Sequence, residues 1–373
     1  MAGFAWGGSE ELWAAAAREA LAVGHRVVAL VPRWRPRAPG IERLMDAGAT
    51  VFERHRFHSK KLRRLVDRLT LRYWSLSRHQ PELLCISEGA AYDFLSGEHG
   101  MALQQLTRGH RIPYVVVCQY NDEMLLTNQG LRNRALAFYG GAARVVFVAH
   151  HNRRLAERQL ACRLPNAVVV QNPLILANTT PVPWRTRSET VRFCSVARLH
   201  TRHKGQDVLL EAFSASVWRQ RPWELRLYGA GPDDDYLHRL AQMFDIADRV
   251  KFMGHVPDVG TLWAENDILV LSSYGEGTPL ALMEAMLCGR PAVVTDVGGN
   301  TDWVEESATG FVAPAATRHS LGAALERAWA ARDQWVQMGQ QAHEVALARH
   351  DPNAGRTLLG ILEVAARTGR SGQ

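Results

Sequence analysis

The chain has 373 residues, of which 47% are apolar and 22% charged, with a formal net charge of +7. This length exceeds the roughly 250 to 300 residues at which one hydrophobic core stops growing, so two domains are expected. No apolar run approaches the ~18 residues that span a bilayer, and Glu10 and Glu11 stand where a signal peptide would be basic, which predicts a soluble, cytoplasmic protein. Five cysteines without CxxC spacing argue against a disulfide framework and a zinc site.

A first helix is predicted within residues 7–25, which open with the glycine pair Gly7 and Gly8; Ser9 is the predicted N-cap and Gly24 lies beyond the helix end. A doubly wound domain normally opens with a strand that leads into such a glycine loop. Only six residues precede this helix. The first strand of the N-terminal domain is therefore expected to be missing or truncated.

The positive charge is concentrated in the N-terminal half. Residues 1–174 hold 24 Lys/Arg against 14 Asp/Glu, whereas residues 175–373 hold 20 against 23. Much of the excess lies in the segment 54–74, whose apolar and basic residues alternate at helical spacing. We favour a solvated amphipathic helix that packs on its own domain; the alternative is weak peripheral contact with an acidic acceptor or with the inner face of a membrane. No nucleic-acid-binding signature accompanies the charge.

Short β-branched runs alternate with helical segments along the whole chain, which predicts parallel sheets covered by helices. The pattern restarts after residue 190, so we expect two doubly wound domains in tandem. The predicted strands are 26–31, 50–53, 82–87, 114–119, 144–149 and 167–171 in the first domain, and 191–197, 224–229, 249–254, 267–273 and 291–295 in the second.

The domain boundaries follow from composition. Residues 1–174 form the predicted N-terminal Rossmann-like domain, and the proline-rich stretch 175–190 is the predicted linker. Residues 191–350 form the C-terminal Rossmann-like domain. The helix predicted at 351–373 is expected to cross back to the N-terminal domain.

The most informative segment is YGEGTPLALMEAMLCGRP at 274–291. It predicts a loop and a helix, with Thr278 as N-cap and Pro279 as the first helical residue. The backbone N–H groups of Gly277, Thr278 and Leu280 would then point out of the helix start, where they could bind a phosphate. Glu284 lies inside this otherwise uncharged helix, so it needs either an arginine of its own domain or the hydroxyls of a ligand as partner.

Two further segments lie at the same predicted sheet edge. Arg198 ends the strand 191–197 and Lys204 follows six residues later, so two cations would face a doubly charged group. The strand 224–229 leads into Gly229 and Gly231, but Pro232 and three aspartates follow in place of a third glycine. NAD binding is therefore disfavoured, and a tight strand-to-helix turn near a nucleotide is the better interpretation.

Taken together, these motifs resemble the retaining, nucleotide-sugar-dependent glycosyltransferases of family 4, which have two Rossmann-like domains facing across a cleft, the GT-B fold. The resemblance covers nearly the whole chain. It rests on Gly7-Gly8, on RL…KGQDVLLEAF at 198–213, on YGAGP at 228–232, on FMGHV at 252–256, and most specifically on the E-x7-E spacing of Glu276 and Glu284.

The resemblance implies a role for each matching residue. Arg198 and Lys204 match the pair that neutralises the leaving nucleoside diphosphate, and Glu276 matches the glutamate that faces the donor sugar. Glu284 matches the glutamate that accepts hydrogen bonds from the ribose hydroxyls. The donor-binding matches are completed by the segment Gly277, Thr278, Pro279 and Leu280, by Gly229 and Gly231, by His255 and Val256 beside the base, and by Gly7 and Gly8 from the opposite domain.

The N-terminal domain departs from the family pattern in one respect. The family often has a histidine at a strand end there, near the donor sugar, and the corresponding stretches 85–93 and 118–123 contain none. Glu88, Asp93 and Asn121 are candidate substitutes; each could equally be a loop cap or an acceptor contact.

The predicted function is that of a retaining hexosyltransferase (EC 2.4) that moves a sugar from a UDP- or GDP-sugar to an unidentified acceptor. No tightly bound cofactor and no metal are expected, because fixed cations and helix-start amides can stabilise the leaving diphosphate electrostatically. Two alternatives remain: a nucleotide-sugar 2-epimerase of the same fold, and a catalytically inactive nucleotide-sugar-binding module.

Overall fold

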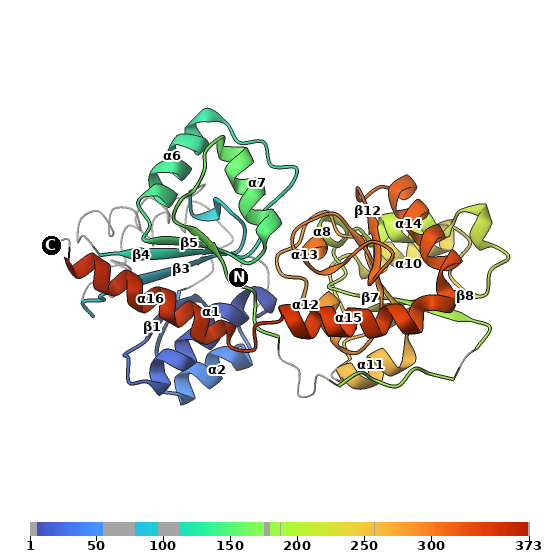
Figure 1. Cartoon of the computed structure of the whole chain (residues 1–373), viewed down its shortest axis with the longest axis horizontal. Coiled ribbons are helices and arrows are strands. Elements are labelled where there is room, and N and C mark those ends of the chain that lie inside the picture. Colours follow the sequence, from blue (N-terminus) through green and yellow to red (C-terminus); the bar gives the residue numbers. More distant parts are fainter. Residues whose placement is uncertain are drawn as a thin grey trace. The chain divides into compact units, whose positions relative to one another are not determined.

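The computed structural model describes residues 6–54, 79–95, 112–174, 180–186, 188–256 and 258–371. It divides into two compact units, Met1–Pro173 with Asp351–Gln373 and Leu174–His350. Figure 1 shows helices and parallel strands in both units. The predicted α/β class is confirmed. The basic segment lies outside the described residues from position 55 onward, and so do residues 1–5, where the first strand was in question.

The N-terminal unit has two parallel sheets among its described residues. One pairs β1 with β2, and the other has the order β3-β4-β5-β6. The elements are α1 (Gly8–Ala22), β1 (Val28–Pro32), α2 (Pro39–Asp46), β2 (Thr50–Arg54), β3 (Leu84–Glu88), η1 (Asp93–Leu95), β4 (Tyr114–Cys118), α6 (Gln129–Gly140), β5 (Arg144–Phe147), α7 (His150–Leu160), β6 (Ala167–Val169) and α16 (Ala354–Ser371).

Strand β4 lies at the centre of this unit, and all five of its residues are buried. Successive side chains of a strand point to opposite faces, so the two faces of β4 join different parts of the core. Val115 and Val117 pack in a cluster with Leu12 of α1 and Leu358 of α16, whereas Val116 packs in a second cluster. Helix α16 lies along α1 (Figure 1), which makes the C-terminal helix part of this unit.

The C-terminal unit has one parallel sheet of six strands in the order β12-β11-β10-β7-β8-β9. Its elements are β7 (Val191–Val196), α8 (Thr201–Lys204), α9 (Gln206–Phe213), η2 (Ser216–Trp218), β8 (Trp223–Tyr228), α10 (Asp234–Met243), β9 (Val250–Gly254), α11 (Val259–Glu265), β10 (Ile268–Leu271), α12 (Leu280–Leu287), β11 (Ala292–Thr295), α13 (Asn300–Trp303), β12 (Gly310–Ala313), α14 (Arg318–Ala330), η3 (Arg332–Gln334) and α15 (Trp335–Arg349).

The strand order reverses between β7 and β10. From β7 the chain proceeds outward to β8 and β9, and it then returns to add β10, β11 and β12 on the other side. In doubly wound sheets, ligands bind at the carboxyl ends of the strands at such a switch point. The loops that follow β7 and β10 are therefore the place to look for a ligand site in this unit.

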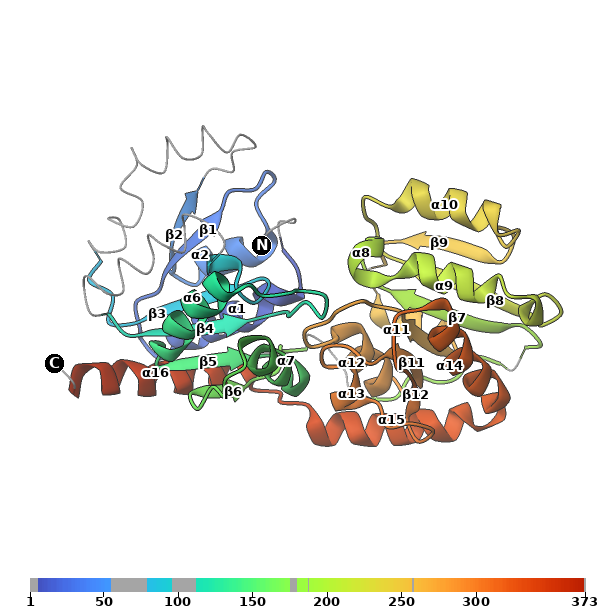
Figure 2. The same ribbon diagram turned by 90° about the horizontal axis from the view of Figure 1, so that it is seen from above.

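Helices cover both faces of the six-stranded sheet (Figure 2). Leu209 of α9 and Leu321 of α14 belong to the cluster on one face, and Trp263 of α11 and Leu282 of α12 to the cluster on the other. All eleven predicted strands overlap observed ones. Strand β12 was not predicted, because its four residues begin with Gly310 and are too few to show a pattern.

A fully buried arginine holds residues 180–186, part of the predicted linker, against the C-terminal unit. Arg290 has no exposed surface, and its guanidinium donates to the carbonyls of Val182 (3.0 Å), Pro183 (2.9 Å) and Asn266 (3.0 Å). Burial lowers the pKa of this guanidinium. Its planar fork of five N–H donors is suited to bind several carbonyls at once.

Candidate functional site

Lys204 and Glu276 meet at the switch point of the C-terminal unit. Lys204 ends the short helix after β7, and Glu276 lies in the loop after β10. The Nζ atom of Lys204 lies 2.7 and 2.9 Å from the two carboxylate oxygens of Glu276, which is only 7% exposed. Ser273 also donates its hydroxyl to Glu276. Two residues predicted for the donor site, 72 positions apart, thus form one partly buried ion pair.

The backbone holds these two loops together. The amide of Tyr274 donates to the carbonyl of His203 at 3.0 Å, and the hydroxyl of Ser272 donates to the carbonyl of Lys204 at 2.9 Å. Gly205 has φ +59°, and a Cβ at this position would lie 2.1 Å from the carbonyl oxygen of Ser272. Only glycine permits both this conformation and this approach. Gly205 therefore allows the backbone next to Lys204 to pack closely against the loop that follows β10.

Arg198 follows β7 directly, and its loop is held by polar contacts. Gln206 donates to the carbonyl of Arg198 at 2.8 Å. Asp233, just before α10, accepts from the amide and the hydroxyl of Thr201 at 2.7 and 2.9 Å. Burial lowers the pKa of the Arg198 guanidinium, and the negative charge of Asp233 opposes this shift. The guanidinium is thus a partly buried cation beside the Lys204 loop.

Gly229 and Gly231 pack against the loop that carries Arg198. A Cβ on Gly229 would lie 2.2 Å from the carbonyl oxygen of Ala197, and one on Gly231 would lie 2.1 Å from that of Leu199. Any side chain at either position would displace the backbone around Arg198. The observed contacts of these glycines are with protein backbone, so they position the arginine loop.

Helix α12 begins later than predicted. It starts at Leu280, with Pro279 as the N-cap and no side-chain cap from Thr278, because the ψ of Pro279 is +87° and lies outside the helical range. The prediction of Thr278 as N-cap and Pro279 as first helical residue is therefore wrong by one residue. Among the described residues, the amides of Gly277 and Leu280 have no hydrogen-bond acceptor, so they are available to bind an anion.

Glu284 lies on the second turn of α12 and is partly buried. Burial alone raises its pKa to about 7. Within the part of the chain that the structure describes, no arginine or other side chain binds its carboxylate, although one was considered as a partner from the sequence. A carboxylate without a partner in an apolar helix is costly, so the geometry favours a ligand as the source of hydrogen bonds.

Similarity to known proteins agrees with this arrangement. Residues 190–331 match the sequence profile of the glycosyl transferases group 1. The match to this family covers 142 of the 373 residues, within the C-terminal unit. The family resemblance of the sequence is thereby confirmed.

Two curated relatives of this glycosyltransferase domain align over part of the chain. An uncharacterized glycosyltransferase of Haemophilus influenzae is 31% identical over 148 residues, 39% of this chain and 41% of that protein. The N-acetyl-alpha-D-glucosaminyl L-malate synthase of Bacillus anthracis is 36% identical over 107 residues, 29% of this chain and 28% of that protein. The chain thus matches less than half the length of either relative.

Solved structures match nearly the whole chain. Anabaena Alr3699/HepE in complex with UDP and glucose is 18% identical, with a TM-score of 0.71 and coverage of 96% of each chain. A glycosyltransferase of Rickettsia africae is 14% identical, with a TM-score of 0.73 and coverage of 97% of this chain and 96% of that one. The predicted GT-B fold is confirmed.

Four other residues predicted for the glycosyltransferase donor site remain predictions. His255 follows β9 and is exposed, whereas Val256 packs on the core beside α11. Gly7 is the N-cap of α1 and Gly8 is its first residue, so the prediction of Ser9 as N-cap is wrong. The surroundings of these four residues do not show whether they bind a ligand.

The candidate residues of the N-terminal unit have different surroundings. Glu88 is fully buried and accepts from Tyr139 (2.8 Å) and from the amide of Phe94 (3.3 Å), and burial raises its pKa to about 7. These contacts tie Glu88 to the core of its own unit, and its role in a ligand site stays a prediction. Asp93 accepts from the amide of Ala90 at 2.9 Å and so caps a turn. Asn121 is 2% exposed, and no contact assigns it a ligand role.

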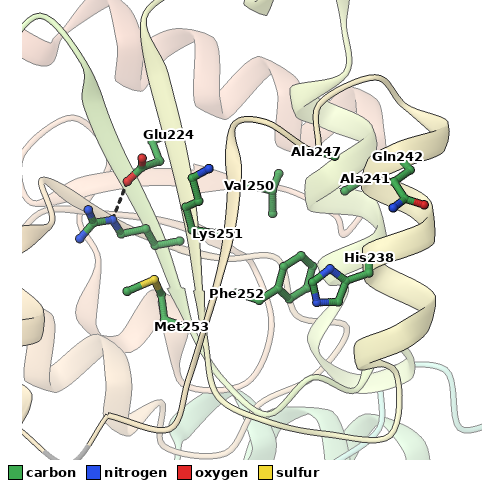
Figure 3. Close-up of a pocket in the computed structure, with 10 residues that line it drawn as sticks. Glu224, His238, Ala241, Gln242, Ala247, Val250, Lys251, Phe252 and Met253 are labelled. Atoms are coloured by element: carbon green, nitrogen blue, oxygen red, sulfur yellow. Dashed lines mark hydrogen bonds and ion pairs between the residues drawn. The ribbon is translucent and has the colours of Figure 1, made fainter.

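A surface pocket of about 680 Å³ lies beside the edge strand β9 and helix α10 (Figure 3). The ring of His238 stacks on Phe252 there, with the ring centroids 3.6 Å apart. None of the predicted site residues lines this pocket. Among the described residues, no group of three or more His, Cys, Asp or Glu could hold a metal ion, and no helix is long and apolar enough to cross a bilayer.

Sequence reasoning missed three residues that shape the site: Ser273, Gln206 and Asp233. Ser273 contacts Glu276 three residues later in the same loop, whereas Gln206 and Asp233 contact the loop that follows β7. Asp233 is one of the three aspartates that argued against a phosphate near this turn. Its carboxylate is engaged by Thr201, and the Thr201 amide holds its pKa below the ordinary value. Nothing in the local pattern could have indicated that contact.

Proposed function

We propose that the chain transfers a hexosyl group from a UDP-sugar to an acceptor, with retention of the anomeric configuration. The observation that carries the proposal is the pairing of Lys204 with Glu276 at the switch point between β7 and β10. The helix that follows bears Glu284, whose carboxylate has no partner among the described residues. HepE was crystallised in complex with UDP and glucose, and the Bacillus anthracis relative is named as a glucosaminyl enzyme; both support a UDP-hexose as donor.

Lys204 and Arg198 would hold the leaving diphosphate. An ammonium group has three N–H donors, and two of those of Lys204 point to Glu276. The third can bind a phosphate oxygen while the carboxylate keeps the side chain in place. As the bond between sugar and phosphate breaks, negative charge develops on the diphosphate, and these fixed cations with the amides of Gly277 and Leu280 would stabilise it.

The two glutamates would bind the rest of the donor. An ionised carboxylate accepts hydrogen bonds and cannot donate them, so Glu284 is suited to two neighbouring hydroxyls of a ribose. Glu276 is oriented by Lys204 and Ser273 and would face the sugar hydroxyls. His255 and Val256 would border the base, and Gly7 and Gly8 would approach the donor from the N-terminal unit. In this proposal, Gly229 and Gly231 act indirectly through the position of Arg198.

The acceptor would be activated by the donor itself. In a front-face mechanism, the acceptor oxygen bonds to the anomeric carbon on the side from which the diphosphate leaves. As the bond between that carbon and the diphosphate breaks, a phosphate oxygen of the leaving group takes the proton of the acceptor hydroxyl. A double displacement would need a carboxylate nucleophile, as in retaining glycosidases. Glu276 is occupied by Lys204 and Ser273, which favours the front-face path.

A thermal-shift screen of UDP, GDP, ADP and their sugars tests the donor assignment. Ligands that bind only the folded protein raise its melting temperature. We expect UDP and UDP-hexoses to raise it by several degrees more than the guanine and adenine counterparts at equal concentration. A larger shift with GDP, or none with any nucleotide, would reject the proposed donor.

A further inference from the structure

The loop between β4 and α6 in the N-terminal unit carries two large apolar side chains that are exposed to solvent. Leu126 is 93% exposed and Met124 is 78% exposed, the highest values for large apolar residues among those the structure describes. Leu125, between them, packs against the core. Single exposed apolar residues are common on protein surfaces, but two at the tip of one loop call for a partner.

This loop is held in shape by hydrogen bonds. Gln159 of α7 donates its side-chain N–H to the carbonyls of Asp122 (2.8 Å) and Leu125 (3.3 Å). The carboxylate of Asp122 accepts from the amide of Met124 at 2.9 Å, and the hydroxyl of Thr127 donates to the carbonyl of Gln159 at 2.7 Å. The exposed side chains are therefore presented by a braced turn, so little ordering entropy opposes their binding to a partner.

Arginines border the same loop. Arg132 donates to the hydroxyl of Thr127 at 3.0 Å, and Arg158, whose side chain is 72% exposed, pairs with Glu123 at 3.5 Å. Arg163, which follows α7, pairs with Glu157 at 2.9 Å, and its side chain is 89% exposed. Residues 122–163 hold seven arginines against three acidic residues, so this stretch of the chain carries an excess of positive charge.

We propose that the loop Asp122–Asn128 inserts Met124 and Leu126 into the headgroup region of an anionic lipid bilayer, while the neighbouring arginines meet the lipid phosphates. A stable protein partner normally covers about 800 Å² of each surface, far more than two side chains supply. A bilayer needs only a few inserted apolar side chains, with cations beside them to add attraction to anionic lipid. This role is distinct from the donor chemistry of the C-terminal unit.

Vesicle co-sedimentation with the full chain tests this proposal. We expect wild type to bind vesicles of phosphatidylcholine and phosphatidylglycerol more strongly than vesicles of phosphatidylcholine alone. The double variant Met124→Ser/Leu126→Ser should lower the partition coefficient by about ten-fold, because two apolar side chains no longer leave water. The matched control is Met243→Ser, a 66% exposed methionine of the C-terminal unit, which should bind as wild type does.

Two outcomes would overturn the proposal. One is that wild type shows no preference for phosphatidylglycerol. The other is that the double variant binds these vesicles as wild type does, which would assign membrane binding to another part of the chain. Equal melting temperatures of the three proteins would exclude misfolding as the cause of a loss. The variant Arg158→Gln/Arg163→Gln should reduce the preference for phosphatidylglycerol without abolishing binding to it.

Discussion

Replacing Lys204 with alanine is expected to weaken UDP binding by about 10- to 100-fold, because a charge-assisted hydrogen bond to the diphosphate contributes roughly 1.5–3 kcal/mol. The carboxylate of Glu276 would then lack the ammonium group of Lys204 and would repel the phosphates. Because Glu276 is only 7% exposed, water would screen this repulsion weakly. Isothermal titration of UDP at constant ionic strength measures the change.

Lys251 provides the control for this variant. It is the other lysine of the C-terminal unit, and it is exposed on the edge strand β9. Lys251→Ala changes the net charge by the same amount as Lys204→Ala, so it controls for charge. It should bind UDP as wild type does. If Lys204→Ala and Lys251→Ala both kept wild-type affinity, the diphosphate would have to bind elsewhere.

Glu284 predicts a pH dependence of donor binding. Burial raises its pKa to about 7 in the free protein, and only the ionised carboxylate accepts from two ribose hydroxyls. A bound ribose therefore favours ionisation and lowers this pKa in the complex. UDP affinity should be highest above pH 7 and should fall as the pH drops below 7. In Glu284→Gln the dependence should be lost, with affinity at pH 8 reduced by about ten-fold or more.

The same substitution should stabilise the free protein at alkaline pH. The carboxyl is protonated more readily in the folded chain, with a pKa of about 7, than in the unfolded chain, with a pKa near 4.5. Its contribution to stability is present below pH 4.5 and is lost as the pH rises through 7. Urea unfolding at pH 8 should show Glu284→Gln to be more stable than wild type by on the order of 2–3 kcal/mol.

The exposed Glu344 of α15 serves as control for both measurements. Glu344→Gln should follow wild type in affinity and in stability at every pH. Parallel pH profiles for wild type and Glu284→Gln would show that the carboxylate of Glu284 does not meet the nucleotide.

Much of the fold was predictable because buried parallel strands are nearly continuous apolar runs. The segments ILVL and AVVT became β10 and β11, with every residue buried. The start of α12 was less predictable. The sequence Thr-Pro favours an N-cap followed by a first helical residue, yet the contacts of this loop hold Pro279 outside the helix.

The charged residues of the site were predictable from their spacing, but their partners were not. Lys204 and Glu276 were assigned to different parts of the donor, and the structure shows that they also bind each other. That contact depends on β7 and β10 being neighbours, which no local pattern contains. The partner of Glu88 was not predictable either: the sequence places this glutamate at a strand end, and the fold buries it beside Tyr139.

The most direct test of the account is time-resolved proton NMR of UDP-glucose and UDP-N-acetylglucosamine with the full chain and no acceptor. We expect slow cleavage of one donor to UDP and free sugar, with the α-anomer released first and Lys204→Ala showing little turnover. A 2-epimerase would instead form the 2-epimeric sugar, and an inactive binding module would leave both donors intact. Release of the β-anomer first, or either of these two results, would contradict a retaining glycosyltransferase.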